Sequence, residues 1–290
     1  MSTRVKSPAD GTFRAPALSL LLDRVLGWLV AGVVVAGVLF LLAPLVAVVG
    51  TSFNPYPSVH FPPEKLTLTS YQDIDPGLYR SFVTSIQLAL LSTLIGALVA
   101  LPAALGLARG GLRPRVAIAA DTVFRSPLQV PELVVAVALF HFYVVIYGLA
   151  AIPLRGTFAG LVVAHVLLVA PYVLVALYAR LVALGTRLEE ASEGLGERPV
   201  RTFLRITVPM MKPALLAAGT LSFLVSFDNV PISLFLAGPG ASPFPVALFT
   251  ASELSVSPAI YAAATVALLV SIAATLLIER FVGLRTVLSL

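Results

Sequence analysis

Six long apolar stretches restrict what this sequence can fold into. They cover approximately residues 26–50, 81–108, 127–149, 158–179, 214–237 and 257–278. A helix of about 20 mainly apolar residues is long enough to cross the ~30 Å hydrocarbon layer of a membrane. Glycine and proline inside such stretches are tolerated because neighbouring groups satisfy the freed backbone. The sequence therefore predicts an all-α integral membrane protein with six transmembrane helices, organised as a single domain over residues 1–290.

The composition supports a membrane protein. Hydrophobic residues make up 59% of the chain and charged residues only 11%, whereas a soluble domain carries roughly a quarter charged residues. The first apolar run, residues 25–49, is uncharged and much longer than the core of a signal peptide, which is about 7–15 residues. We therefore expect an uncleaved first transmembrane helix.

The distribution of basic residues predicts how the helices are oriented. Of the 19 lysine and arginine residues, only Lys65, Arg80 and Arg155 fall in the segments on one side of the six spans. Basic residues favour the cytoplasmic side of a membrane. We therefore expect both termini in the cytoplasm, with residues 1–24 as a cytoplasmic tail. The same distribution explains the net charge of +5 without a nucleic-acid partner.

The sequence lacks the residues that several kinds of chemistry require. It contains no cysteine, and its three histidines lie far apart, so we expect no metal site and no cofactor. None of the lysines (Lys6, Lys65, Lys212) follows a glycine, so the Gly-Lys-Ser/Thr of a phosphate-binding loop is missing. No nucleophile–base arrangement is evident either. These features favour a protein that is not an enzyme and would take any ATP-driven work from a separate chain.

A polar loop, residues 189–209, separates the fourth and fifth apolar stretches and is expected to be cytoplasmic. Helical spacing would bring Glu189, Glu193 and Glu197 onto one face. Gly196 can adopt a positive φ and so end one short helix before another begins. Pro199 suits the first turn of that second helix. The loop is therefore expected to form a helix–turn–helix hairpin that can dock on a partner.

The second helix of this hairpin is expected to present an apolar patch. The patch consists of Val200, Phe203 and Leu204, beside Arg201 and Arg205. Pro209 is expected to break the helix before the fifth span begins. A hairpin lying on the membrane surface is the alternative to a docking hairpin.

The same loop resembles the EAA loop of ABC-importer permeases, written E-A-A-x3-G-x9-I-x-L-P. The matching residues at this spacing are Glu190, Ala191, Gly196, Ile206 and Pro209. Ser192 replaces the second alanine and Val208 replaces the leucine. The resemblance implies that the hairpin is a coupling helix that fits a cleft in an ATPase subunit, with the glycine at the turn. It implies that the five matching residues belong to this ATPase-coupling surface.

Two carboxylates fall inside the apolar stretches. Asp228 lies in the middle of the fifth stretch, which it interrupts together with Pro231, and Glu132 lies early in the third. Ionisable groups within a membrane are costly and usually face a cavity or a partner. Two carboxylates along a path would favour a cation, and nearby aromatic rings such as Phe227 could add cation–π contacts. Alternatively, Asp228 caps a helix broken at Pro231 or pairs with a partner's arginine, and Glu132 is a first-turn residue.

Two further polar residues share one face of the fourth stretch. His165 and Tyr172 are seven residues apart, so a helix places them on the same side. That side could line a cavity, or it could make polar contacts between packed helices. His60 and His141 suggest no role. The complete candidate substrate pathway comprises Asp228, Ser226, Asn229, Glu132, Phe227, Tyr172 and His165.

The sequence around Asp228 narrows the resemblance. Residues 226–231 (SFDNVP) with 237–239 (AGP) and 243–245 (PFP) resemble the fifth span and following loop of spermidine/putrescine-type permeases, in particular the second, "C"-type, subunit. The resemblance implies a bacterial inner-membrane importer that works by alternating access. The implied partners are two copies of an ATPase, a second homologous permease and a periplasmic or lipid-anchored solute-binding protein. The expected solute is a polyamine or a similar small cation.

Other functions remain open on the sequence. Similar permeases are thought to carry phosphonates, ferric iron or amino-acid derivatives, and these solutes are alternatives to a polyamine. A secondary transporter driven by an ion gradient would also contain intramembrane carboxylates, but it needs no docking loop and more often has internal repeats. A scaffold subunit without transport activity is the third alternative.

Overall fold

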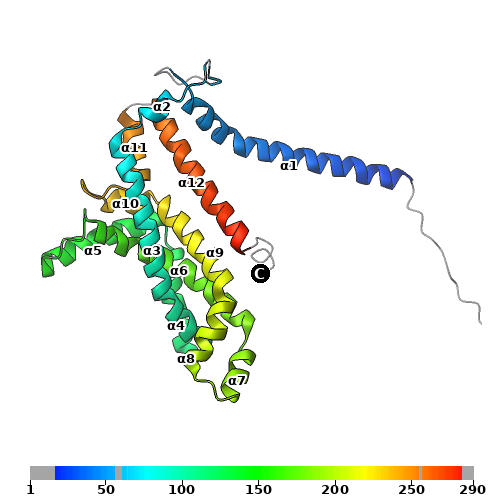
Figure 1. The fold of residues 1–290 in the computed structure, drawn as a ribbon, viewed down its shortest axis with the longest axis vertical. Coiled ribbons are helices and arrows are strands. Elements are labelled where there is room, and N and C mark those ends of the chain that lie inside the picture. The colour runs from blue at the N-terminus through cyan, green and yellow to red at the C-terminus, as the bar shows by residue number, and fades with distance from the viewer. Residues whose placement is uncertain (1–16, 56–60, 64, 255–256, 283–290) are drawn as a thin grey trace, which may run out of the picture.

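A computed structural model of the chain describes residues 17–55, 61–63, 65–254 and 257–282 (Figure 1). Most of the expected tail 1–24 and the last residues, 283–290, lie outside this range. His60 also lies outside it.

The six predicted membrane helices are confirmed. Six helices are long and apolar enough to cross a membrane: Arg24–Ser52, Pro76–Arg109, Glu132–Ala150, Phe158–Leu184, Pro199–Phe227 and Pro258–Leu276. They correspond to α1 (Ala17–Ser52), α3 (Pro76–Arg109), α5 (Glu132–Ala150), α6 (Phe158–Leu184), α9 (Val208–Phe227) and α12 (Pro258–Val282). Within the described ranges the other regular structure is short helices and one isolated bridge between Gly238 and Ala241.

Shorter helices connect or extend the six spans. They are α2 (Thr69–Gln72), α4 (Pro114–Arg125), η1 (Ser126–Leu128), α7 (Arg187–Gly194), α8 (Pro199–Thr202), η2 (Phe203–Thr207), α10 (Pro231–Leu236) and α11 (Phe244–Leu254). The α7–α8 hairpin lies at one end of the bundle, and α2 and α11 lie near the other (Figure 1). The molecule therefore has a hairpin end and an opposite end.

The core of the bundle is formed by α3, α6 and α9, which pack side by side (Figure 1). α6 is the most buried span. Small residues of α3, such as Ala100 and Ala104, pack against Val173 and Leu177 of α6. Close packing of small against branched side chains is how membrane helices associate, since lipid offers no hydrophobic driving force between them. This core carries the hairpin at one end and a cavity near its middle.

Two spans project from this core. α1 runs away from the bundle and contacts α12 (Figure 1), and its large apolar side chains, Trp28 and Phe40 among them, are exposed. α5 projects on another side and is held at Tyr143, whose buried hydroxyl donates a 2.7 Å hydrogen bond to the Gly160 carbonyl oxygen of α6. Both helices therefore expose apolar surface that lipid or another subunit must cover.

The predicted interruption of the fifth stretch, 214–237, at Asp228 and Pro231 is confirmed, but the expected position of Asp228 in the middle of a span was wrong. α9 ends at Phe227, and Asp228 therefore lies at a helix end rather than mid-helix. A new short helix, α10, begins at Pro231, which suits a first turn because it needs no N–H donor. Asn229 stabilises the break, since its Oδ1 accepts a 3.0 Å hydrogen bond from the backbone N–H of Ile232.

The predicted helix break at Pro209 was also wrong. The chain is helical without interruption from Pro199 to Phe227, and Pro209 lies in the first turn of α9. A proline ring inside an α-helix collides with the carbonyl four residues earlier. Here the preceding segment, η2, is a π-helical turn, whose wider spiral accommodates the ring.

Gly160 allows the chain before α6 to approach its first turn. A methyl group at this position would overlap the carbonyl of Leu154. We predict that Gly160→Ala lowers the free energy of unfolding by about 1–3 kcal/mol, the usual cost of overpacking. Gly148→Ala in α5 is the matched control, because nothing lies within 4 Å of the added atom. Thermal unfolding of the purified proteins in detergent measures the difference, and equal midpoints would contradict the packing argument.

Candidate functional site

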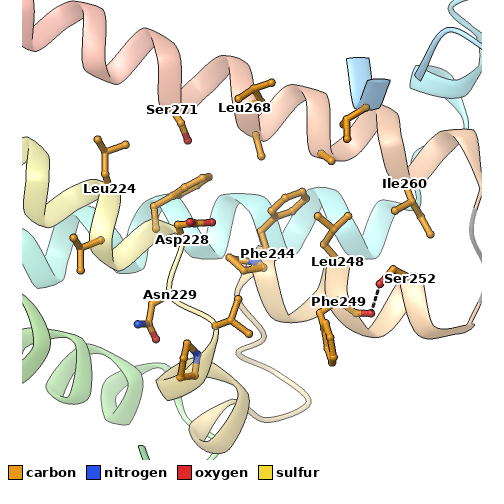
Figure 2. Close-up of a pocket in the computed structure, with 18 of the residues that line it drawn as sticks. Leu224, Asp228, Asn229, Phe244, Leu248, Phe249, Ser252, Ile260, Leu268 and Ser271 are labelled. Atoms are coloured by element: carbon orange, nitrogen blue, oxygen red, sulfur yellow. Dashed lines mark hydrogen bonds between the residues drawn. The ribbon is translucent and has the colours of Figure 1, made fainter. Parts of the chain in front are cut away.

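An open cavity of about 1160 Å³ lies beside the break between α9 and α10. Figure 2 shows Asp228 and Asn229 at this break, with Phe244 and Leu248 of α11 and Leu268 of α12 around the same space. Most of the wall is apolar. The cavity is therefore mainly apolar, with a few polar side chains in its wall.

Five of the seven predicted pathway residues line this cavity. They are Asp228, Asn229, Glu132, Phe227 and Tyr172. They come from α5, α6 and the end of α9, so the fold brings together positions almost 100 residues apart. Their placement puts them on one surface.

Asp228 is the exposed carboxylate of the cavity. Its side chain is accessible, and among the described residues none forms a hydrogen bond or an ion pair with it. Aromatic rings surround the neighbouring position: Phe227 stacks on Phe223 and meets the edge of Phe82, each with ring centroids 5.8 Å apart. An unpaired carboxylate in a cavity that is also lined by Phe227, Phe244 and Tyr172 is suited to a positively charged ligand.

Glu132, the second carboxylate of the cavity wall, already has a partner. Asn229 donates a 2.9 Å hydrogen bond from Nδ2 to Glu132 Oε2, while its Oδ1 holds the start of α10. Asn229 is almost completely buried. This one amide therefore ties the beginning of α5 to the helix break.

The remaining two predicted pathway residues lie behind the cavity wall. His165 is fully buried, and its Nδ1 lies 2.8 Å from Ser226 Oγ and its Nε2 3.1 Å from Ser233 Oγ. The histidine therefore joins α6 to both sides of the break, to the last turn of α9 and to α10. Among the alternatives considered from the sequence, its contacts match those of a polar link between packed helices. Tyr172 reaches the cavity, so the two residues do not act on one surface.

The polar loop forms the predicted hairpin. α7 ends at Gly194, Gly196 has a φ of 86°, and α8 begins at Pro199. A 2.9 Å hydrogen bond between Ser192 Oγ and Thr202 Oγ1 joins the two short helices. A positive φ of this size favours glycine over any residue with a side chain.

The hairpin exposes residues that match the EAA pattern, two in α7 and one at the turn. Glu190, Ala191 and Gly196 are exposed; at its base Pro209 is also exposed and Ile206 is half-buried. Large apolar side chains accompany them: Leu195 is 91% exposed and Val200 is 71% exposed. Large apolar side chains that are this exposed on a helical hairpin are typical of a binding surface.

The predicted common face of Glu189, Glu193 and Glu197 was wrong, because α7 ends before the third of them. Glu197 follows the turn and lies 3.5 Å from Arg201 and 3.7 Å from Arg205. Glu193 is exposed. Glu189 points the other way, toward the bundle.

Sequence reasoning missed the contacts that hold the hairpin to the bundle. Arg109 Nε donates to Glu189 Oε2 at 2.8 Å, and Thr207 Oγ1 donates to Glu189 Oε1 at 2.7 Å. From the sequence, Arg109 was only one of the basic residues whose distribution predicts the orientation of the helices in the membrane. No spacing rule connects residues this far apart in the sequence, so only the fold reveals the cluster. Elsewhere in the described ranges, His, Asp and Glu form no group of three that could hold a metal.

Comparison with protein families gives one match over most of the chain. The family model "Binding-protein-dependent transport system inner membrane component" matches residues 93–286. This range includes the five predicted pathway residues that line the cavity, α7–α8, and Arg109, Glu189 and Thr207.

Curated relatives include two polyamine permeases. The putrescine transport system permease protein PotI of Escherichia coli (strain K12) is 33% identical over 143 residues, 49% of this chain and 51% of PotI. The spermidine/putrescine transport system permease protein PotC of Haemophilus influenzae is 30% identical over 189 residues, 65% of this chain and 69% of that protein. The chain thus spans about half the length of the E. coli relative it matches.

Solved structures share the fold. A chain of a bacterial ABC transporter involved in the import of the acidic polysaccharide alginate superposes with a TM-score of 0.67 at 15% identity, covering 90% of this chain and 96% of that chain. A chain of the inward-facing MetNI methionine ABC transporter gives a TM-score of 0.56 at 20% identity, covering 71% and 94%. At these identities the likeness shows the architecture alone.

His165 can be tested as the link across the helix break. We predict that His165→Leu destabilises the protein by about 1–3 kcal/mol, because the hydroxyls of Ser226 and Ser233 lose their buried partner. His141→Leu is the matched control, since His141 is an exposed position on α5 and lipid contact suits leucine. Unfolding midpoints in detergent compare the two variants. Equal stability of both would contradict a structural role for the histidine.

Proposed function

Because the chain belongs to the family of binding-protein-dependent transport system inner membrane components, we propose that it is the permease subunit of an ABC importer for polyamines or similar small cations. The proposal of a cationic solute rests on the unpaired Asp228 carboxylate in a cavity lined by aromatic side chains. The chain itself performs no chemistry on the solute, and ATP is hydrolysed by a separate partner.

The cavity chemistry supports a protonated amine. An ammonium group near Asp228 would form a charge-assisted hydrogen bond and contact the faces of aromatic rings. Glu132 offers a second carboxylate on the same wall, which suits a solute with two or more amines. The names of the relatives, putrescine and spermidine permeases, point to the same class of solute. The fold alone is neutral on this point, since one solved relative is described as importing an acidic polysaccharide.

The hairpin supports coupling to an ATPase. Its outer surface exposes Glu190 and Ala191 of α7 and Gly196 of the turn, together with large apolar side chains, which suits docking into a cleft. Its second helix is continuous with α9 through η2, Ile206 lies in η2 and Pro209 in the first turn of α9, and α9 ends beside Asp228. Movement of the docked hairpin would therefore reach the cavity wall along one helix. This connection provides a physical route for alternating access.

The remaining partners and the orientation follow from the same role. The bias of basic residues toward the hairpin side supports an orientation in a bacterial inner membrane with that end and both termini in the cytoplasm. The exposed length of α1 supports contact with a second, homologous permease. A periplasmic or lipid-anchored binding protein would deliver the solute at the opposite end.

Stimulated ATP hydrolysis tests this function. The complex that co-purifies with this chain would be placed in lipid discs with its binding protein and challenged with polyamines, amino acids, phosphonates and iron chelates. We expect spermidine or putrescine to stimulate hydrolysis. Stimulation by a phosphonate or an iron chelate alone would contradict the proposal that the cavity binds a cation. The absence of any co-purified ATPase would contradict the proposed permease role.

Replacing the unpaired carboxylate tests the solute site. We predict that Asp228→Asn raises the polyamine concentration needed for half-maximal uptake about 10–100-fold, because a charge-assisted contact contributes about 1.5–3 kcal/mol. Glu253→Gln is the matched control, since Glu253 is an exposed carboxylate of α11 outside the cavity wall. Uptake of radiolabelled polyamine measures both, and unchanged kinetics for Asp228→Asn would remove Asp228 from the pathway.

The turn of the hairpin tests the coupling surface. We predict that Gly196→Val reduces transport and ATPase co-purification several-fold, because a β-branched residue at a φ of 86° is strained by roughly 1–3 kcal/mol. Gly194→Val is the matched control: it lies two residues earlier, also with nothing within 4 Å, but without a positive φ. Both variants should insert normally. Full transport by Gly196→Val would argue against a docking role for this turn.

A further inference from the structure

Arg109, Glu189 and Thr207 form a polar cluster at the base of the hairpin, which we call the hairpin anchor. Its members come from the end of α3, from α7 and from η2. The ion pair between Arg109 and Glu189 is short, at 2.8 Å, and the two side chains are only 19% and 21% exposed. The anchor is therefore a largely buried contact, unlike the exposed pairs on most protein surfaces.

Arg109 joins α3 to α6 as well as to the hairpin. Its Nη2 donates to the carbonyl oxygens of Leu181 at 2.9 Å and Gly185 at 2.7 Å, which lie at the C-terminal end of α6. These carbonyls have no partner within the helix, and a cation favours the negative end of the helix dipole. The guanidinium group therefore fixes the end of α6 while its Nε holds Glu189.

Glu189 also connects the anchor to the start of α9. Its Oε2 accepts from Arg109, and its Oε1 accepts from the hydroxyl of Thr207, which is 3% exposed. Thr207 is the last residue of η2, immediately before α9. One carboxylate thus links α7 to the ends of α3 and α6 and to the start of α9.

The hairpin joins the bundle through two segments with irregular backbone, Gly185 and η2, and the anchor connects the helices on either side of them. Before α7 the chain passes through Gly185, which has a φ of 62° and nothing within 4 Å of an added Cβ. After α8 it passes through the π-helical turn η2, a local irregularity in the helix. Without the anchor, the first helix of the hairpin would be attached to the membrane helices mainly through these two points.

The other ion pairs of the described ranges do not make this connection. Asp121 pairs with Arg125 within α4, and Glu197 pairs with Arg201 and Arg205 within the hairpin. The neighbouring acids of α7 also differ in direction: Glu190 is exposed, whereas Glu189 is held inward. One side of α7 is therefore free to meet a partner while the other is fixed to the bundle.

We propose that Arg109, Glu189 and Thr207 are positioning residues that make the hairpin move as one body with α3, α6 and α9, and so set the amount of solute transported per ATP hydrolysed. The proposal rests on the coupling role proposed for the hairpin. It assigns the anchor no contact with ATP or with solute. Loss of the anchor therefore lowers transport more than it lowers ATP hydrolysis.

The first test removes the central carboxylate. The co-purified complex in proteoliposomes is assayed for polyamine uptake and ATP hydrolysis in the same preparation. We expect Glu189→Ala to lower the ratio of uptake to hydrolysis at least about fivefold. Asp121→Ala is the matched control, because it removes a carboxylate from an arginine ion pair of 2.6 Å that stays within one helix, and its ratio should equal that of the wild type.

A second pair of variants decides the question if Glu189→Ala assembles poorly. Thr207→Val removes the hydroxyl but preserves the shape of the side chain, whereas Thr207→Ser keeps the hydroxyl. We expect Thr207→Val to lower the ratio about two- to fivefold and Thr207→Ser to leave it close to the wild-type value. We expect this contrast because only Thr207→Ser keeps the hydrogen bond to Glu189. If Thr207 acted through packing alone, Thr207→Val would preserve the ratio and Thr207→Ser would lower it.

The outcomes separate this proposal from the proposed function. A wild-type complex without ATP-driven uptake contradicts the permease role itself. A wild-type complex that couples normally, with unchanged ratios in Glu189→Ala and Thr207→Val, retains the permease role and overturns the anchor. Equal losses in Thr207→Val and Thr207→Ser would also overturn it.

Discussion

A membrane helix that stops within the bilayer leaves backbone groups that lipid cannot hydrogen-bond. α9 stops in this way at Phe227, and the side chains around the break supply what the backbone needs. Asn229 accepts from the N–H of Ile232, and His165 links Ser226 to Ser233 across the gap. The break is what turns Asp228 from a helix-interior residue into a carboxylate that faces a cavity. The shape of the cavity therefore depends on the polar contacts that hold this break together.

The same helix gives the cavity its connection to the hairpin. From Pro199 to Phe227 the chain is helical without interruption, so its two ends are the turn of the hairpin and the edge of the cavity. A proline at position 209 is compatible with this continuity because the π-helical turn before it relieves the clash of the ring. Asn229 then extends the connection to α5 through Glu132. One helix and its contacts therefore connect the hairpin, the break and the cavity wall.

Patterns that depend on neighbouring residues could be predicted from the sequence, whereas contacts between distant segments could not. Apolar length predicted all six spans, and Gly196 with Pro199 predicted the turn and the second helix of the hairpin. Hydropathy could not locate the end of α9, because residues 230–236 are as apolar as the helix before the break. Pattern reasoning placed Glu189 beside Glu193 and Glu197, since it could not foresee Arg109 on the other side. It also could not distinguish Asp228, which faces the cavity, from Ser226, which is turned toward His165.

The energetics of buried ion pairs argue that the anchor serves geometry rather than stability. Removing two charges from water costs about as much as their attraction returns, so well-packed apolar residues often stabilise a protein equally well. Arg109 and Glu189 are nevertheless paired at 2.8 Å with most of their surface buried. Apolar side chains slide past one another, whereas a guanidinium group that donates to a carboxylate and to two carbonyl oxygens has one preferred arrangement. A joint that must transmit force between four helical segments needs that directionality, and hydrophobic packing alone does not supply it.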